Sequence, residues 1–305
     1  MPYPFVDMLL YFFIYSFCGW LMETVLCSIQ EKHFVNRGFL AGPLCPIYGV
    51  GILCILTALL PVRDRLPSLW IAVPVIFVAG AILASVVEYV TSWLMEKLFH
   101  ARWWDYSQYT YNLNGRICLP ISLAWGALAA FFVYVVQPIF ERGVAWLYEA
   151  NVHLPLILAV LCGGIFVIDC VISTRIARTL GNKLEQLDKL GELIQAHLEG
   201  LEMPSAEDML LRVEAAYDRY VGRTKAASDA FREKSREWRH LNRDELADRI
   251  RSRLTELKIK RETLLEQRHG HRRLLRAFPT MRHRHTDGNS LLDELRERWK
   301  IRRRK

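Results

Sequence analysis

The sequence predicts an all-α fold: a polytopic membrane helix bundle of five spans, made of two parallel two-span repeats and one further span, with a C-terminal charged helical tail. Three observations support this prediction. Five apolar runs are long enough to cross a bilayer, one stretch occurs twice, and the excess positive charge lies in the C-terminal part of the chain. A helix needs about 20 apolar residues to span the hydrocarbon core.

The five predicted spans follow from hydropathy. They cover residues 6–29, 44–62, 69–96, 118–139 and 153–176. The first run has no basic segment before it and is too long for the apolar core of a cleavable signal peptide. We therefore expect it to remain as a span.

Charge divides the chain into two predicted domains. The first 180 residues hold ten of the 40 Lys and Arg and ten of the 32 Asp and Glu, so the formal net charge of +8 belongs to 181–305. This shift predicts a transmembrane helix-bundle domain at 1–180 and a cytoplasmic helical or coiled-coil tail at 181–305. The loops 30–43 and 97–117 carry five basic residues against three in the alternate loops. With the basic tail, this bias predicts a bacterial cytoplasmic membrane protein with an external N-terminus and a cytoplasmic C-terminus.

The duplicated stretch supports the two repeats. It reads NRGFLAGPLCPIYG in the first copy and NLNGRICLPISLAWG in the second. Four residue pairs are each separated by 77 positions: Gly38 and Gly115, Pro43 and Pro120, Tyr48 and Trp125, and Gly49 and Gly126. Duplicated groups of spans are typical of permeases.

Three carboxylates lie within the predicted spans, near their cytoplasmic ends. A carboxylate inside a membrane span is costly unless it is paired or hydrated, so each requires a reason. One interpretation is a polar cavity that binds a cation, a proton or a cationic substrate. The other is structural, with pairing to an arginine or capping of loop backbone. The candidate cavity residues are Glu23, Glu88, Asp169, Arg37, Arg116, Asn36 and Asp105.

Glycines, prolines and aromatic residues mark both loops. Gly38, Gly42, Pro43 and Pro46 interrupt helix formation before the second span, as either a partly unwound site or an ordinary proline-led helix start. The second loop is rich in aromatic residues, which suits either a belt at the lipid headgroups or a lid over a cavity with Asp105 as a polar contact. Its aromatic residues are Trp103, Trp104, Tyr106, Tyr109 and Tyr111.

The tail is predicted to be helical, with a break at Met203 to Ser205 and a charge-rich helix over 206–267. Its basic runs at 268–278 and 296–305 suit the anionic leaflet of a membrane, and its apolar stripe suits a homo-oligomer or another subunit. Nucleic acid is an unlikely partner, because no recognised fold accompanies the charge. The seven scattered cysteines form no metal-binding pattern, and no cofactor is predicted.

Several motifs occur in a fixed order between residues 6 and 140. They are Gly19-Trp20-x-x-Glu23, Asn36 to Gly49, Glu88-Tyr89, Trp103 to Ser107, Asn114 to Leu119, and Trp125-Gly126. In these motifs the chain resembles the CmpB-like family, whose members are described as ABC-transporter type IV permeases. The resemblance implies a multi-span membrane protein with a transport role, and it carries no residue-level site with it.

The leading functional hypothesis is a permease-like subunit with a polar cavity near the cytoplasmic face. The alternative is a membrane scaffold or regulator that acts through its basic helical tail. An enzyme is not predicted, because Glu23, Glu88 and Asp105 have no nucleophile or metal motif beside them. The sequence also contains no P-loop of the form GxxxxGK[ST], so the chain is not an ATPase of that type.

Overall fold

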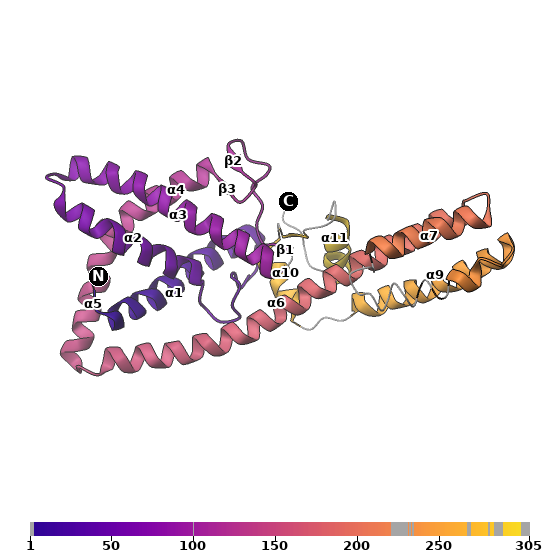
Figure 1. Cartoon of the computed structure of the whole chain (residues 1–305). Helices are drawn as coiled ribbons and strands as arrows, with labels where there is room; N and C mark the ends of the chain where they lie inside the picture. Colours follow the sequence, from indigo (N-terminus) through magenta and orange to yellow (C-terminus); the bar gives the residue numbers. More distant parts are fainter. Residues whose placement is uncertain are drawn as a thin grey trace. The chain divides into compact units, whose positions relative to one another are not determined.

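The computed structural model describes residues 3–99, 101–220, 231, 233, 235–266, 270–279, 281–283 and 289–299 (Figure 1). It divides into two compact units. Unit 1 consists of Met1–Arg178, Gly270–Arg284 and Lys300–Lys305, and unit 2 of Thr179–His269 and His285–Trp299. Parts of the predicted basic runs, residues 268, 269 and 300–305, lie outside the described residues.

The predicted all-α class and its five spans are confirmed. Five helical stretches in the described residues are long and apolar enough to cross a membrane. They are α1 (Phe5–Glu31), α2 (Pro46–Arg65), α3 (Leu69–Phe99), the combined stretch of α4 (Leu119–Phe131), η1 (Phe132–Val136) and α5 (Gln137–Ala150), and α6 (Leu154–Leu201). In each, no more than a third of the most apolar window is buried, as expected for helices whose outer faces meet lipid.

One loop joins the two helices of each repeat. Loop 1, defined here as residues 32–45, has no helix or strand. Loop 2, residues 100–118, contains β1 (Ala101–Arg102) and the antiparallel pair of β2 (Asn112–Leu113) and β3 (Ile117–Cys118). Unit 1 is completed by α10 (His271–Ala277) and β4 (Arg282–His283), which pairs antiparallel with β1.

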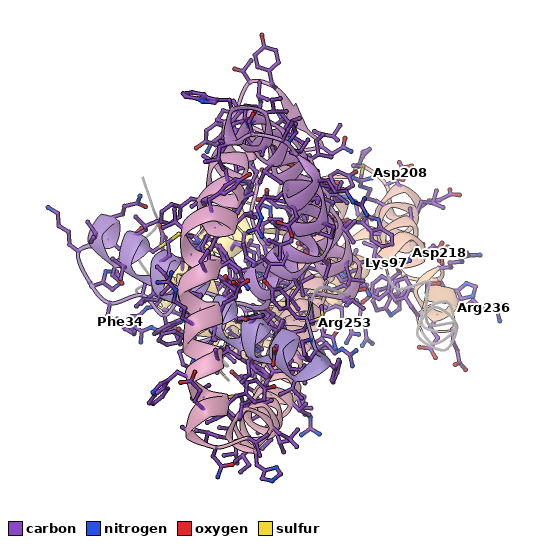
Figure 2. The ribbon with its side chains drawn as sticks, turned by 90° about the vertical axis from the view of Figure 1, so that its left-hand side faces the viewer. Phe34, Lys97, Asp208, Asp218, Arg236 and Arg253 are labelled. Carbon is purple, nitrogen blue, oxygen red and sulfur yellow. The ribbon has the colours of Figure 1, made fainter. Side chains whose placement is uncertain are left out.

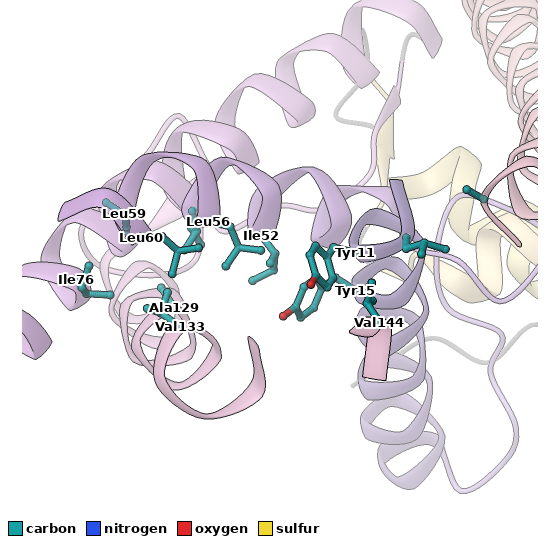
Figure 3. Packing of buried hydrophobic residues seen from close by; sticks show 13 residues of the cluster. Tyr11, Tyr15, Ile52, Leu56, Leu59, Leu60, Ile76, Ala129, Val133 and Val144 are labelled. Atoms are coloured by element: carbon teal, nitrogen blue, oxygen red, sulfur yellow. The ribbon is translucent and has the colours of Figure 1, made fainter. Parts of the chain in front are cut away.

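The core of unit 1 lies between α1, α2, α3 and α4 and extends to α5 (Figure 3). Tyr15 from α1, Leu56 from α2, Ile76 from α3 and Val133 from η1 are each at most 1% exposed. Close packing of these interlocking side chains fixes the relative positions of the two repeats.

A π-helical turn, η1, separates α4 from α5. Pro138 follows it and lacks the N–H that would bond to the carbonyl of Tyr134 in a regular α-helix. A local switch to i→i+5 bonding at such a point is a common adjustment. It places Gln137 fully buried, where its side chain bonds to the hydroxyls of Tyr3 and Tyr15.

Unit 2 is built from the last part of α6 with α7 (Ala206–Tyr220), α9 (Arg243–Glu266) and α11 (Asn289–Arg298). Its core joins side chains of α6, α7 and α9. Charged side chains such as Asp208 point outward (Figure 2). The expected continuous helix over 206–267 is wrong, because a turn at Arg239–Leu241 precedes α9. Asn242 and Glu245 form the capping box that starts α9.

Candidate functional site

The two repeats agree in backbone detail. Gly38 has φ +111° and Gly115 has φ +67°, so the equivalent glycines both occupy the region that favours glycine. A Cβ on Gly49 would lie 2.6 Å from the carbonyl oxygen of Phe12, and one on Gly126 would lie 2.7 Å from that of Phe77. In each repeat, therefore, the second helix packs closely on the first at an equivalent glycine.

The first helices of the repeats are related by a different separation. Phe12 and Phe77, Ser16 and Ala81, and Glu23 and Glu88 are each 65 positions apart, whereas the second helices are 77 apart. Ser16 and Ala81 also occupy equivalent positions: Ser16 faces Gly49, and Ala81 faces Gly126. The second repeat thus contains 12 more residues than the first between equivalent positions of its two helices, partly in loop 2 and partly at the adjoining helix ends. Glu23 and Glu88 are equivalent residues of the two repeats.

Glu23 in repeat 1 is neutralised by an ion pair. Its Oε2 accepts a hydrogen bond of 3.1 Å from Nε of Arg37, and its Oε1 accepts one of 2.6 Å from the hydroxyl of Tyr48. Gly19 allows the Tyr48 ring to approach, because a Cβ there would lie 2.2 Å from it. The side chain of Glu23 is 28% exposed, so this is a partly buried pair.

Glu88 in repeat 2 has the equivalent aromatic donor and a different second partner. Its Oε2 accepts a hydrogen bond of 3.0 Å from the indole of Trp125, which is equivalent to Tyr48, and its Oε1 accepts one of 3.2 Å from Tyr106. Glu88 is only 6% exposed. Among the described residues, no Lys, Arg or His forms an ion pair with it. Burial, and then the charge of Glu88, raise the pKa of the Tyr106 hydroxyl, so this hydroxyl stays protonated and donates.

A cavity of about 50 Å³ lies at the interface of the two repeats, next to Glu88. Its wall is almost entirely apolar, and most of it comes from equivalent residues of the two repeats. These pairs are Met22 and Val87, Tyr48 and Trp125, Gly51 and Leu128, Ile52 and Ala129, and Ile55 and Phe132. The Tyr48 and Trp125 rings contact each other edge to face at 5.5 Å between centroids. Glu88 borders this cavity, whereas Glu23 does not.

Asp169 of α6 lies at loop 1 instead of in this cavity. Its carboxylate accepts hydrogen bonds from the backbone N–H groups of Ala41 and Gly42, at 3.0 and 2.7 Å, and from the Ser173 hydroxyl. It therefore caps loop backbone, which is one of the structural roles considered from the sequence. Asn36 is also bound in loop 1, since it accepts from the indole of Trp20 and donates to Ala41.

Arg116 does not approach Glu88. Its guanidinium forms an ion pair of 2.8 Å with Glu96, two turns further along α3, and Arg102 shares the same carboxylate oxygen at 3.3 Å. Asp105, which is 6% exposed, bonds to the backbone N–H and hydroxyl of Ser107 and lies 3.7 Å from Arg102. Loop 2 is thus held by its own charge network.

The inner aromatic residues of loop 2 form part of the packed interior. Trp103 is 2% exposed, the indole of Trp104 donates to the carbonyl of Arg116, and Tyr106 reaches Glu88. Tyr109 and Tyr111 are 42% and 79% exposed. Only these last two have the exposure expected of a headgroup belt. The prolines open the following helices, with Pro46 as the first residue of α2 and Pro120 the second of α4.

Two residues of unit 1 were not among the sequence candidates. Glu96 lies in the amphipathic end of α3, where an acid three residues from the helix end could have been matched to Arg116. Arg273 of α10 donates to three carbonyls of loop 1. It belongs to a basic run with no periodic pattern, so the sequence carried no signal for its role.

The fold and these contacts define an integral membrane protein of two repeats with a buried acid at their interface. Comparison with known families identifies it further. The chain belongs to the family described as "Putative ABC-transporter type IV", whose model matches residues 10–174. The match covers both repeats and the first part of α6. No curated protein and no solved structure matched the chain.

Proposed function

We propose that this protein is a permease-like membrane subunit in which Glu88 binds a proton or a small cation at the interface of the two repeats. Membership of a transporter-type family supports a transport role. In transporters built from repeats, substrate and coupling-ion sites lie at the repeat interface within the membrane. The cavity beside Glu88 is lined by residues of both repeats, which supports such a site.

The observation that carries the proposal is a buried carboxylate with neutral partners. An ionised carboxylate in an apolar interior is strongly disfavoured unless a positive group accompanies it. Glu23 obtains this group from Arg37, whereas Glu88 has only the hydroxyl of Tyr106 and the indole of Trp125 among the contacts described above. Glu88 therefore provides the position at which an exchangeable positive charge is stabilised.

The size and wall of the cavity restrict the ligand. A volume of about 50 Å³ has room for roughly three to five water molecules at 10–15 Å³ each. An organic solute of ordinary size does not fit. Metal cations such as Ca²⁺ take about six to eight oxygen ligands, while the wall offers one carboxylate and few other oxygens. A proton fits this site best.

Flux measurements on the purified full-length protein in lipid vesicles test the proposal. With a pH-sensitive dye inside and an imposed potential, the wild type should conduct protons and Glu88→Gln should not. Glu149→Gln is the matched control, because Glu149 is an exposed acid at the end of α5. Equal flux in wild type and Glu88→Gln, with both variants folded, would contradict the proposal. Wild-type vesicles that pass neither protons nor Na⁺, K⁺ or ammonium would contradict it as well.

We also propose a location in the cell for the membrane domain, its loops and the tail. The distribution of basic residues supports a bacterial cytoplasmic membrane, with loops 1 and 2 and the C-terminus in the cytoplasm. The tail, residues 181–305, is proposed to contact the anionic leaflet or partner subunits. Deleting the whole tail would be a poor test of a regulatory role, because it would also remove α10, which packs within unit 1. Replacing exposed charges of α9 while α10 is kept separates the two effects.

A further inference from the structure

Loop 1 directs three consecutive carbonyl groups toward a single guanidinium. Arg273 of α10 donates from Nη1 to the carbonyls of Gly38 and Leu40, at 3.1 and 2.7 Å, and from Nη2 to that of Phe39, at 2.7 Å. Hydrogen bonds that involve a charged donor are roughly twice as strong as neutral ones. One side chain from the C-terminal part of unit 1 therefore satisfies most of the carbonyls at the centre of loop 1.

The reverse contact is made by an arginine of loop 1. Arg37 donates to the carbonyl of Ala277, and its guanidinium lies 5.0 Å from the centroid of the Phe278 ring. That ring packs edge to face on Trp103 of loop 2 at 4.8 Å. Arg37 is also the partner of Glu23, so it connects the acid of repeat 1 to the end of α10.

Repeat 2 satisfies two of the three equivalent carbonyls with donors from its own loop. Gly115, equivalent to Gly38, accepts from the backbone N–H of Tyr106 at 2.8 Å. Arg116, equivalent to Phe39, accepts from the indole of Trp104 at 3.1 Å. Both donors lie in loop 2, which has 19 residues against 14 in loop 1. Repeat 1 therefore lacks an internal cover for its loop.

We propose that loop 1, together with Trp103, is a receptor site for one guanidinium and one aromatic ring, and that the chain's own segment 270–279 fills it as a releasable cover. The site takes a short peptide in which an arginine precedes a phenylalanine by five positions, as Arg273 precedes Phe278. The segment supplies hydrogen-bond donors to the loop carbonyls of repeat 1, as Trp104 and Tyr106 of loop 2 do in repeat 2.

The segment has the properties of a part that orders on docking. The helix α10 has seven residues, and isolated helices shorter than about 12 residues are marginal in water. The apolar side chains of α10 are nevertheless buried, with Leu274, Leu275 and Ala277 each 0% exposed. The chain enters and leaves this segment through residues of unit 2, so a rearrangement of unit 2 would pull on it through the backbone.

Limited digestion with trypsin tests the cover, because Arg37 is itself a cleavage site. In the wild-type protein the side chain of Arg37 is only 16% exposed. Arg273→Gln should accelerate cleavage of the Arg37–Gly38 bond at least tenfold, measured by mass spectrometry of the fragments. Cleavage of a transiently opened segment follows the population of the open form. Tenfold corresponds to about 1.4 kcal/mol of opening free energy.

Arg276→Gln is the matched control, since Arg276 is an exposed arginine of the same helix. It should leave cleavage after Arg37 unchanged. Phe278→Ala keeps the Arg273 clamp and should also accelerate cleavage, which provides a second test if Arg273→Gln fails to fold. Wild-type cleavage rates in folded Arg273→Gln or Phe278→Ala, or equal acceleration in Arg276→Gln, would overturn the receptor site. Protection that rises with protein concentration would place the segment of a second copy in the site and would overturn the assignment to the same chain. The assay needs no transported solute, so its outcome is independent of the proposed function.

Discussion

Adding a methyl group at Gly49 tests the packing that the two repeats share. In Gly49→Ala the new Cβ would lie 2.4 Å from Oγ of Ser16 and 2.6 Å from the carbonyl oxygen of Phe12. The second atom belongs to the backbone, so α1 and α2 must separate. Overpacking costs about 1–3 kcal/mol, and the preference for Ala over Gly in a helix offsets about 0.5–1 kcal/mol of it. We expect a net loss of about 1–2 kcal/mol.

Thermal unfolding of the purified protein in detergent would measure this loss. A change of 1 kcal/mol shifts the Tm of a domain of 150–250 residues by about 2–4 °C, so Gly49→Ala should lower the Tm by about 2–8 °C. Gly126→Ala should behave alike, because its Cβ would meet the carbonyl oxygen of Phe77 at 2.7 Å.

Gly51→Ala is the control, since a Cβ at this position of the same helix meets nothing within 4 Å. It should raise the Tm by about 1–4 °C, because alanine favours the helix. Equal melting temperatures for Gly49→Ala and Gly51→Ala would refute the argument that close helix contact requires Gly49. A loss at Gly49 with none at Gly126 would refute the equivalence of the repeats.

Two further predictions concern loop 1 and unit 2. Asp169→Ala leaves the N–H of Gly42 without its acceptor, while that of Ala41 keeps the Ser173 hydroxyl. The loss should cost about 1–3 kcal/mol and appear as faster hydrogen exchange at Gly42; unchanged exchange would contradict the capping role. The hydrogen bonds from Arg298 lower the pKa of Glu262, so the stabilisation by this pair is present above the ordinary carboxyl pKa and is lost as the pH falls through the lowered value. The difference in unfolding free energy between wild type and Glu262→Gln should therefore shrink on acidification in denaturant titrations, and a difference that is constant with pH would contradict it.

The sequence predicted features that depend on local chemistry. Spans are predictable because a long apolar run can be accommodated in lipid only as a helix that satisfies its own backbone hydrogen bonds. The five apolar runs correspond to five helical stretches in the structure. Gly38 and Gly115 were found as a pair because both need a positive φ, which side chains disfavour. The capping box of Asn242 and Glu245 is also a local sequence pattern, and it predicts a helix start within the single helix expected over 206–267.

Partner choice was less predictable because it depends on tertiary distances. Glu23 and Glu88 look alike in sequence, and arginines follow both. Loop 1 brings Arg37 onto Glu23, whereas the longer loop 2 carries Arg116 past Glu88 to Glu96. The additional 12 residues thus decide which acid keeps a positive partner. The separation of 65 positions between the first helices reveals this insertion, and it can be read once the two glutamates are aligned.

The π-turn at Phe132–Val136 acts as a one-residue phase shift within a single membrane crossing. Trp125 and Leu128 upstream of it and Phe132 at its first position line the cavity, while Gln137 downstream bonds to Tyr15. Without this turn, the same residues in a regular α-helix would place everything after it about 100° further round the axis, the angle per residue at 3.6 residues per turn. Gln137 would then turn away from Tyr15 and lose its hydrogen bond to it. The π-turn absorbs one residue without advancing the helix, and this one residue sets the phase of α5 relative to α4.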